Sequence, residues 1–408
     1  MIKTISIHQL TIGMYVQGLD CSWVNHPFMV NQFVIKSQEQ INKIKSAGIR
    51  TLSIDTDKGV DVEGVVTAGE SEKIAAEPPE VVVPAPSVPE KSSLKEELTR
   101  AATVKKEATQ LVTKLMGDAR LGKRITCHQV LPVVGNMVDS VMSNKDALLG
   151  LTRIRKLDKY SFEHSVGVSI LLVAFGESIA FCDEDLVQLG IGGFLMDIGK
   201  SLAPEKLLNK PGKLSQSEYA VMQQHVEHSQ KILLEMPDVS EIVMNIAMEH
   251  HERYDGSGYP GKLSGDGISI YGQMAAIVDV YDALTSRRAY SDGMAPHLAM
   301  KKLIAAGGQF NQELVLKFIH CVGVYPVGSL VVLSNGLFAV VLEQSKRGQL
   351  QPKIRIIFDS TKRQLIEARD LDLSDPDAKE SLDIVGGVEP SKWRIKPQDY
   401  LDHARYSH

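Results

Sequence analysis

The chain has 408 residues, of which 43% are hydrophobic and 23% are charged, and its formal net charge is −5. This length predicts two or three domains, and the acidic balance argues against a protein that coats a nucleic acid polymer. The four cysteines are scattered without a CxxC pair, which argues against a disulfide framework or a zinc ribbon. The longest apolar stretch, 166–175, is about half of the ~20 residues that a membrane helix needs. We therefore expect a cytoplasmic protein without a membrane span.

The N-terminal part, residues 1–66, is predicted to be a small α/β module. Its alternating and amphipathic segments indicate strands at 4–7, 14–17 and 51–54 and a short helix at 38–47. A stretch rich in Pro, Glu and Ala follows over 67–92, and it indicates a semi-extended linker because proline fixes φ and lacks a backbone donor. The next segment is rich in Ala, Lys, Glu and Leu, and it predicts a connecting helix within 93–126.

Residues 127–322 have helical periodicity in nearly every long segment, so we predict a mainly α protein whose central domain is a helical bundle. Ser215 and Glu218 have the spacing of a capping box. The residues that then share one helix face are Tyr219, Met222, Val226, Ser229 and Leu233. Asp238 with Glu241 predicts the start of the next helix. Its apolar face continues through Ile242, Ile246 and His250.

A small β extension and tail are predicted over 323–408. The strand candidates are 330–333, 337–342 and 353–358. The first two flank Asn335-Gly336, a dipeptide typical of a two-residue hairpin turn. The end of the chain is polar, and we expect it to be loose.

Histidine and aspartate recur on successive predicted helices of the bundle. The residues are His164, Asp197, His225, His250, His251 and Asp279. A lone histidine on an apolar helix face is more often a hydrogen-bonded core residue. Burying this many polar side chains together, however, is costly unless something coordinates them. Imidazole and carboxylate are ligands of Fe, Mn and Zn, so the set predicts a metal centre.

Asp197 has two carboxylate oxygens and could bridge two cations. Two metals ~3.5–4 Å apart can acidify a water for in-line attack on phosphorus. Lys200 lies three residues later on the same helical face, where it could neutralise a phosphate oxygen or assist the leaving alkoxide; an ordinary surface lysine is the alternative. We therefore predict Asp197 and Lys200 as catalytic residues.

Three segments resemble the HD-GYP family, in the family's order and at similar separations. They are GGFLMDIGK at 192–200, HHERYDGSGYP at 250–260 and IVDVYDALTS at 277–286. The resemblance covers about half of the chain and is highly specific. It implies a helical bundle of the HD superfamily over 127–322, and residues 1–66 resemble the uncharacterised domain that often precedes HD-GYP.

The resemblance implies a bacterial phosphodiesterase that opens cyclic di-GMP to pGpG and often continues to GMP. It also implies two divalent metal ions, Fe²⁺ or Mn²⁺. One ion would be bound by His164, residue 196, Asp197 and Asp279. The other ion would be bound by Asp197, His225, His250 and His251.

The resemblance also implies contacts outside the metal ligands. Lys200 would contact the scissile phosphate, and Asp282 and Arg288 would lie at the ligand. The loop Gly258-Tyr259-Pro260 is linked in the family to diguanylate cyclases of the GGDEF type. A homodimer is a further expectation.

The sequence departs from the family at its name-giving His-Asp pair, which is Met196-Asp197 here. A thioether is a poor ligand for Mn²⁺ or Fe²⁺, so we expect Met196 to pack in the core. The first metal site would keep three protein ligands and be partly occupied, and activity would be reduced.

Two alternatives stay open. Met196 and Ser291, which stands where the family commonly has a basic residue, favour a module that binds cyclic di-GMP or a cyclase without turnover. A general HD-type nucleotide phosphohydrolase is the other alternative, and the intact Tyr259-Pro260 loop disfavours it. A Met196→His variant and a nucleotide screen would discriminate between these hypotheses.

Overall fold

The computed structural model describes residues 2–6, 9–19, 33–35, 37, 41, 44–45, 51–56, 58–60, 94–152, 160–208, 210, 212–286, 293–345, 348, 350–375 and 382–401. The chain divides into two compact units, Met1–Val88 and Pro89–His408, and each is described by itself. Across the described residues, none of the helices combines the length and the apolar character that crossing a bilayer requires.

The N-terminal unit contains a four-stranded antiparallel sheet of order β1-β4-β2-β3. Its strands are β1 (Ile2–Ser6), β2 (Tyr15–Leu19), β3 (Phe33–Val34) and β4 (Thr51–Asp55). Alternate side chains of the strands, among them Val16, Leu52 and Ile54, are fully buried in its core. The alternating pattern thus located β1, β2 and β4 correctly. Of the helix predicted over 38–47, the described residues 41, 44 and 45 are helical, and the others lie outside the described residues.

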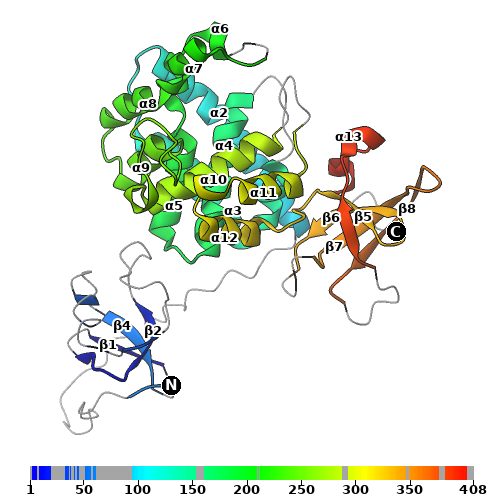
Figure 1. Ribbon diagram of the computed structural model, residues 1–408, viewed down its shortest axis with the longest axis horizontal. Helices are drawn as coiled ribbons and strands as arrows, with labels where there is room; N and C mark the ends of the chain where they lie inside the picture. Colours follow the sequence, from blue (N-terminus) through cyan, green and yellow to red (C-terminus); the bar gives the residue numbers. More distant parts are fainter. Residues whose placement is uncertain are drawn as a thin grey trace, which may run out of the picture. The chain divides into compact units, whose positions relative to one another are not determined.

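The second unit is mainly helical (Figure 1). Its α-helices are α2 (Leu94–Arg120), α3 (Cys127–Thr152), α4 (Tyr160–Ser178), α5 (Asp183–Leu195), α6 (Glu205–Leu208), α7 (Gln216–Gln223), α8 (His225–Leu234), α9 (Glu241–Glu249), α10 (Ile270–Thr285), α11 (Pro296–Ala305) and α12 (Gln312–Val322). Short 3₁₀ helices are η4 (Ile198–Leu202), η5 (Gly265–Gly267) and η6 (Gly307–Gln309). The predicted helical bundle is confirmed.

Helix α4 is the centre of the bundle and packs against α2, α3, α5, α10 and α12 (Figure 1). Every side chain from 170 to 175 is at most 3% exposed. A helix that is apolar on all sides belongs in an interior, which explains the longest apolar stretch of the sequence. His164 lies near the N-terminal end of this helix, so it is carried into the core with it.

Two helix starts were predicted from the sequence. The capping box before α7 is confirmed, because Ser215 Oγ accepts from Glu218 N and Glu218 accepts from Ser215 N. The predicted start of α9 at Asp238 is wrong. Ser240 caps this helix by accepting from Val243 N, whereas Asp238 has a φ of 62° and belongs to the preceding turn.

The C-terminal part forms a five-stranded antiparallel sheet of order β8-β7-β6-β5-β9. Its strands are β5 (Leu330–Leu333), β6 (Leu337–Glu343), β7 (Lys353–Asp359), β8 (Gln364–Asp372) and β9 (Ile384–Gly387). The predicted hairpin is confirmed between β5 and β6, where Gly336 adopts a φ of 82° that suits glycine.

The end of the chain packs against this sheet through α13 (Pro390–Trp393) and η7 (Pro397–Tyr400). The Trp393 ring lies edge-on to Phe338 at 4.8 Å. Arg355 binds the Asp370 carboxylate and donates to the Tyr400 carbonyl at 2.8 Å. The expectation of a loose tail is therefore wrong as far as residue 401, because these buried contacts hold it; residues 402–408 lie outside the described residues.

Candidate metal centre

Five parts of the bundle bring the predicted histidines and aspartates together. The residues are His164 on α4, Asp197 between α5 and η4, His225 at the first position of α8, His250 and His251 at the end of α9, and Asp279 on α10. Asp197, His225 and His250 are each at most 2% exposed. The two oxygens of Asp197 face different groups, so we call the group of His225, His250 and His251 the Oδ1 side, and the group of His164, Asp279 and Lys200 the Oδ2 side.

On the Oδ1 side, backbone carbonyls fix the orientation of two imidazoles. His225 Nδ1 donates to the Met222 carbonyl at 2.6 Å, and His250 Nδ1 donates to the Ala247 carbonyl at 3.0 Å. In the neutral form each ring therefore carries a lone pair on Nε2. These two Nε2 atoms lie 3.4 Å apart, and they lie 3.3 and 3.6 Å from Asp197 Oδ1.

Asp197 Oδ1 is buried without a hydrogen-bond partner. Burial lowers the pKa of His225, so this ring stays neutral and has no proton to offer the oxygen. Several lone pairs facing one another in a buried space are unfavourable unless a cation lies among them. One ligand atom each of Asp197, His225, His250 and His251 lies within 4.8 Å of all the others. The residues present therefore fit a metal ion.

His251 completes this group from the C-terminal side of α9. Its ring stacks on Tyr259 with centroids 4.7 Å apart and lies edge-on to His225 at 5.0 Å. Burial and the neighbouring His250 hold the pKa of His251 well below its usual value. Its neutral ring can therefore offer a lone pair as well.

The Oδ2 side is an ion-pair network instead. Lys200 Nζ donates to Asp197 Oδ2 at 2.5 Å. His164 Nε2 lies 3.0 Å from Asp279 Oδ1 and 3.7 Å from Asp197 Oδ2, while His164 Nδ1 lies 2.7 Å from Asp282 Oδ2. These residues also fit a metal ion, because His164 Nε2 and oxygens of two carboxylates converge there.

Charge on the Oδ2 side shifts several pKa values. Burial opposes a charged imidazole, but hydrogen bonds to Asp279 and Asp282 outweigh it and raise the pKa of His164 to about 9. Burial alone would raise the pKa of Asp197, yet the Lys200 ammonium holds it well below its usual value. The pKa of Asp279 is also low, because the His164 contact overcomes burial. The carboxylates are therefore ionised at neutral pH.

Met196, the departure from the family pattern, is completely buried at the end of α5. Its N–H donates to the Gly192 carbonyl, and its own carbonyl accepts from Ser229 Oγ at 2.7 Å. Ser229 Oγ also accepts from Gly199 N at 2.9 Å. One hydroxyl of α8 is therefore hydrogen-bonded to both ends of the turn that contains Asp197. The sequence placed Ser229 on the buried face one turn after His225, but gave no signal for these two bonds.

The loop Gly258-Tyr259-Pro260 packs beside His251. A Cβ at Gly258 would overlap Arg253 N and Glu252 Cα, so the loop can approach α9 this closely only with glycine there. The buried carboxylate of Glu252 accepts from Gly261 N at 2.6 Å and from Leu263 N at 3.1 Å. Sequence reasoning missed Glu252, although an acidic residue directly after two buried histidines was the available signal.

Asp282 and Arg288 were predicted to lie at the ligand. Asp282 is 2% exposed, and its carboxylate lies against His164 Nδ1, on the opposite side of that ring from Asp279. The structure therefore places it behind a histidine rather than at an open surface. Arg288 lies outside the described residues, as do all residues of 287–292.

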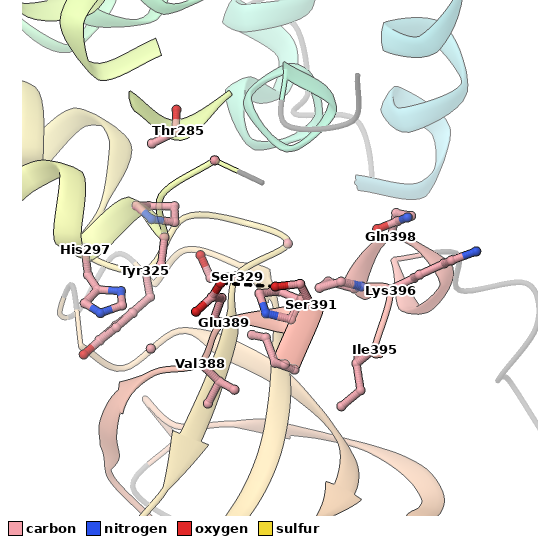
Figure 2. Close-up of a pocket in the computed structure, with 18 of the residues that line it drawn as sticks. Thr285, His297, Tyr325, Ser329, Val388, Glu389, Ser391, Ile395, Lys396 and Gln398 are labelled. Carbon is pink, nitrogen blue, oxygen red and sulfur yellow. Dashed lines mark hydrogen bonds between the residues drawn. The ribbon is translucent and has the colours of Figure 1, made fainter. Parts of the chain in front are cut away.

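A cavity of about 490 Å³ lies elsewhere, between the helical bundle and the C-terminal sheet. Figure 2 shows Thr285, His297 and Tyr325 on one side of it and Glu389, Ser391 and Gln398 on the other. None of the residues on either side of Asp197 lines this cavity.

Comparison with known proteins identifies the family. The chain is 35% identical over 405 residues to the cyclic di-GMP phosphodiesterase PA4108 of Pseudomonas aeruginosa, a match that covers 98% of this chain and 95% of that protein. Residues 137–314 match the HD domain, and residues 2–130 match a domain of unknown function, DUF3391. The chain belongs to the HD-GYP family. The predicted family and the predicted fold class are thereby confirmed.

Shorter matches cover parts of the chain. The 3′3′-cGAMP-specific phosphodiesterase 2 of Vibrio cholerae is 43% identical over 182 residues, which is 44% of this chain and 35% of that protein. Residues 330–392 match a KOW domain associated with the HD domain. Among solved structures, Bd1817, an HDG"Y"P protein from Bdellovibrio bacteriovorus, aligns with a TM-score of 0.46 and 18% identity, covering 78% of this chain and 98% of that chain.

Proposed function

We propose that this protein is a metal-dependent phosphodiesterase that hydrolyses cyclic di-GMP to pGpG and GMP. The observation that carries the proposal is Asp197 Oδ1, buried without a hydrogen-bond partner beside Nε2 of His225 and of His250. The relative that matches almost the full length is named a cyclic di-GMP phosphodiesterase, and a shorter match is named for 3′3′-cGAMP. Both names support a cyclic dinucleotide as the class of substrate.

Two groups of residues would hold the metal ions. The Oδ1 side with Asp197 would hold one ion, and His164, Asp279 and Asp197 would hold the other. When bound, two divalent ions, Fe²⁺ or Mn²⁺, supply an acidified water and neutralise charge on the oxygens of phosphorus. Asp197 would orient both groups, because its two oxygens point to opposite sides.

Lys200 is the proposed phosphate contact. Its side chain is 21% exposed, whereas Asp197, to which it donates, is almost completely buried. The ammonium group can therefore leave Asp197 Oδ2 for a phosphate oxygen that arrives from solvent. There it would neutralise charge at phosphorus or donate a proton to the leaving alkoxide. Arg288 is proposed as a further phosphate contact.

The loop Gly258-Tyr259-Pro260 is proposed to contact diguanylate cyclases of the GGDEF type. Gly258 is buried and the Tyr259 ring stacks on His251, whereas Pro260 is exposed. A partner could therefore contact Pro260 without disturbing the metal centre. Substituting Pro260 should weaken such binding while hydrolysis stays within about twofold, since surface changes are usually mild.

The direct test is hydrolysis by protein reconstituted without oxygen with Fe²⁺ or with Mn²⁺. Cyclic di-GMP, 3′3′-cGAMP, pGpG and GMP would be separated by anion-exchange chromatography over a time course. We expect linearisation of cyclic di-GMP with pGpG as the first product. An Asp197→Ala variant is the control, and turnover no greater than that of this variant with several metals would contradict the proposal.

Binding without turnover is the second candidate function, and Met196 is the observation that favours it. A buried thioether at this position supplies no imidazole next to Asp197. If wild type binds cyclic di-GMP without turnover, and Met196→His still shows none, the protein is a receptor. A gain of more than about tenfold in rate would show a weakened enzyme instead, since metal-site changes commonly act on that scale.

A further inference from the structure

We propose that Asp282 is a positioning residue that holds His164 for the metal ion on the Oδ2 side, and that it makes no contact with substrate. The inference rests on the proposed function, because it concerns the same metal centre. It assigns to Asp282 a different role from the ligand contact that the family resemblance implies.

The His164 ring lies between two carboxylates of one helix. Asp279 and Asp282 are three residues apart on α10, so both point to the same face. Asp282 Oδ2 lies 2.7 Å from Nδ1, and Asp279 Oδ1 lies 3.0 Å from Nε2. An ionised carboxylate only accepts hydrogen bonds, so Nδ1 carries a proton that it donates to Asp282. Nε2 is then the atom that can bind a metal.

Among the described residues, Asp282 is buried and only 2% exposed. The cavity that borders Asp282 and Ser286 has a volume of only about 10 Å³. Such a space holds at most about one water molecule. Ser286 Oγ lies 3.3 Å from Asp282 Oδ2 and also donates to the Asp282 carbonyl at 2.5 Å, so the last turn of α10 closes over the carboxylate.

The hydrogen-bond acceptor of Nδ1 differs between His164 and two histidines of the Oδ1 side. His225 and His250 donate Nδ1–H to neutral backbone carbonyls, whereas His164 donates to a carboxylate. A carboxylate partner fixes the ring orientation and makes the metal-binding nitrogen a stronger base. The family resemblance assigns position 196, which is methionine here, to the Oδ2 side. Asp282 therefore strengthens the histidine of the site that has lost an imidazole.

The test is titration of metal-free protein with Mn²⁺, with free and bound ion followed by electron paramagnetic resonance. Wild type and Asp282→Asn would be compared, each also in the Met196→His background. Asparagine keeps the size of the side chain and removes its charge. We expect the weaker of two binding steps to lose about 10–100-fold in affinity, while the tighter step, on the Oδ1 side, is unchanged.

Asp146→Asn is the matched control. Asp146 is also buried, on α3, and its carboxylate accepts from the Gln344 backbone N–H. This variant loses a buried charge as well, so a general loss of stability would affect both variants. We expect both of its Mn²⁺ affinities to equal those of wild type. Thermal unfolding of the metal-free variants would check that each is folded.

Several outcomes overturn the inference. Equal Mn²⁺ affinities in wild type and Asp282→Asn would overturn it. So would an equal loss of affinity at both binding steps of Asp282→Asn, or the same loss of affinity in the Asp146→Asn control. A single bound ion in both wild type and Met196→His would also overturn it, because His164 would then have no ion to bind. The proposed function fails on a different readout, turnover no greater than that of Asp197→Ala, so the two failures are distinguishable.

Discussion

The two sides of Asp197 differ in how their charge is balanced. On the Oδ1 side, histidines from α8 and the end of α9 converge, and two of them present Nε2 lone pairs to an oxygen without a hydrogen-bond partner. On the Oδ2 side, a lysine and a histidine between two carboxylates already balance the charge. A cation can enter the Oδ1 side directly. On the Oδ2 side it must displace a proton from His164 and the ammonium of Lys200.

On the proposed function, Asp197 would therefore serve two metal sites of unequal strength. On the proposed ligand assignment, Met196 would make the inequality larger, because the side that is already harder to fill would have one imidazole fewer. We therefore expect sequential binding, with the Oδ1 side filled first.

Asp197→Asn should have the largest effect, because it weakens a ligand of both sides at once. We expect hydrolysis to fall by at least about 1,000-fold, since losing even an outer partner of a metal site costs about 10–100-fold. Both Mn²⁺ binding steps should weaken in the same titration. If only one step weakened, Asp197 would not bridge the two sides.

The two binding steps should respond differently to pH. The pKa of His164 is raised to about 9, so its ring is protonated at neutral pH and loses the proton as pH rises towards 9. Metal binding that displaces one proton gains about tenfold in affinity per pH unit below that pKa. The weaker step should gain in this way between about pH 7 and 9. The tighter step should stay flat, because the pKa values of His225 and His251 are lowered and these rings are already neutral.

Chelator-buffered Mn²⁺ titrations at several pH values would measure this response. The carboxylates add no slope, since the pKa values of Asp197 and Asp279 lie below their usual range. If the Mn²⁺ affinities of the two steps depended on pH with the same slope, both sides would release the same number of protons. The proposed difference between the Oδ1 side and the Oδ2 side would then be wrong.

Met196→His should reduce the inequality between the two sides. The new imidazole would lie next to Asp197, and we expect it to raise the affinity of the weaker step by about 10–100-fold. The tighter step should change by less than about twofold. If Met196→His strengthened only the tighter step, residue 196 would belong to the Oδ1 side. Calorimetry with both metals would measure the two affinities.

Gly258→Ala should have the smallest effect on metal binding and act mainly on the loop. The added Cβ would overlap the Arg253 backbone, and overpacking of this kind costs about 1–3 kcal/mol. The shift should loosen the stacking of Tyr259 on His251. Gly267→Ala is the control, because a Cβ there meets nothing within 4 Å. Urea unfolding of both metal-free variants would compare their free energies of unfolding, and equal values would contradict the close packing at Gly258.

The sequence predicted much of the fold because its signals are local. The apolar run of α4, the Ser215 capping box and the Asn335-Gly336 turn depend on neighbouring residues only, and all three appear in the structure. The packed tail was missed for the opposite reason. Trp393 and Tyr400 stand among polar residues, and their partners Phe338 and Arg355 are distant in the sequence.

Part of the candidate site was predicted from local signals, and the part that depends on distant partners was missed. His225 and His250 continue apolar helix faces, so their inward direction follows from helical spacing. The direction of Asp282 depends on how α10 packs against α4, and no pattern within α10 reveals that a histidine lies there. The two hydrogen bonds of Ser229 likewise depend on the packing of η4 against α8.

The central claim is that both oxygens of Asp197 face metal ions, of which the Oδ1-side ion is held more tightly. Anomalous diffraction from crystals grown at limiting and at saturating Mn²⁺ tests it most directly. At limiting Mn²⁺, we predict one peak in direct contact with Asp197 Oδ1 and with Nε2 of His225 and His250. At saturating Mn²⁺, a second peak should appear beside His164 Nε2 and Asp279. A first peak beside His164, or no peak in contact with Asp197, would contradict the account.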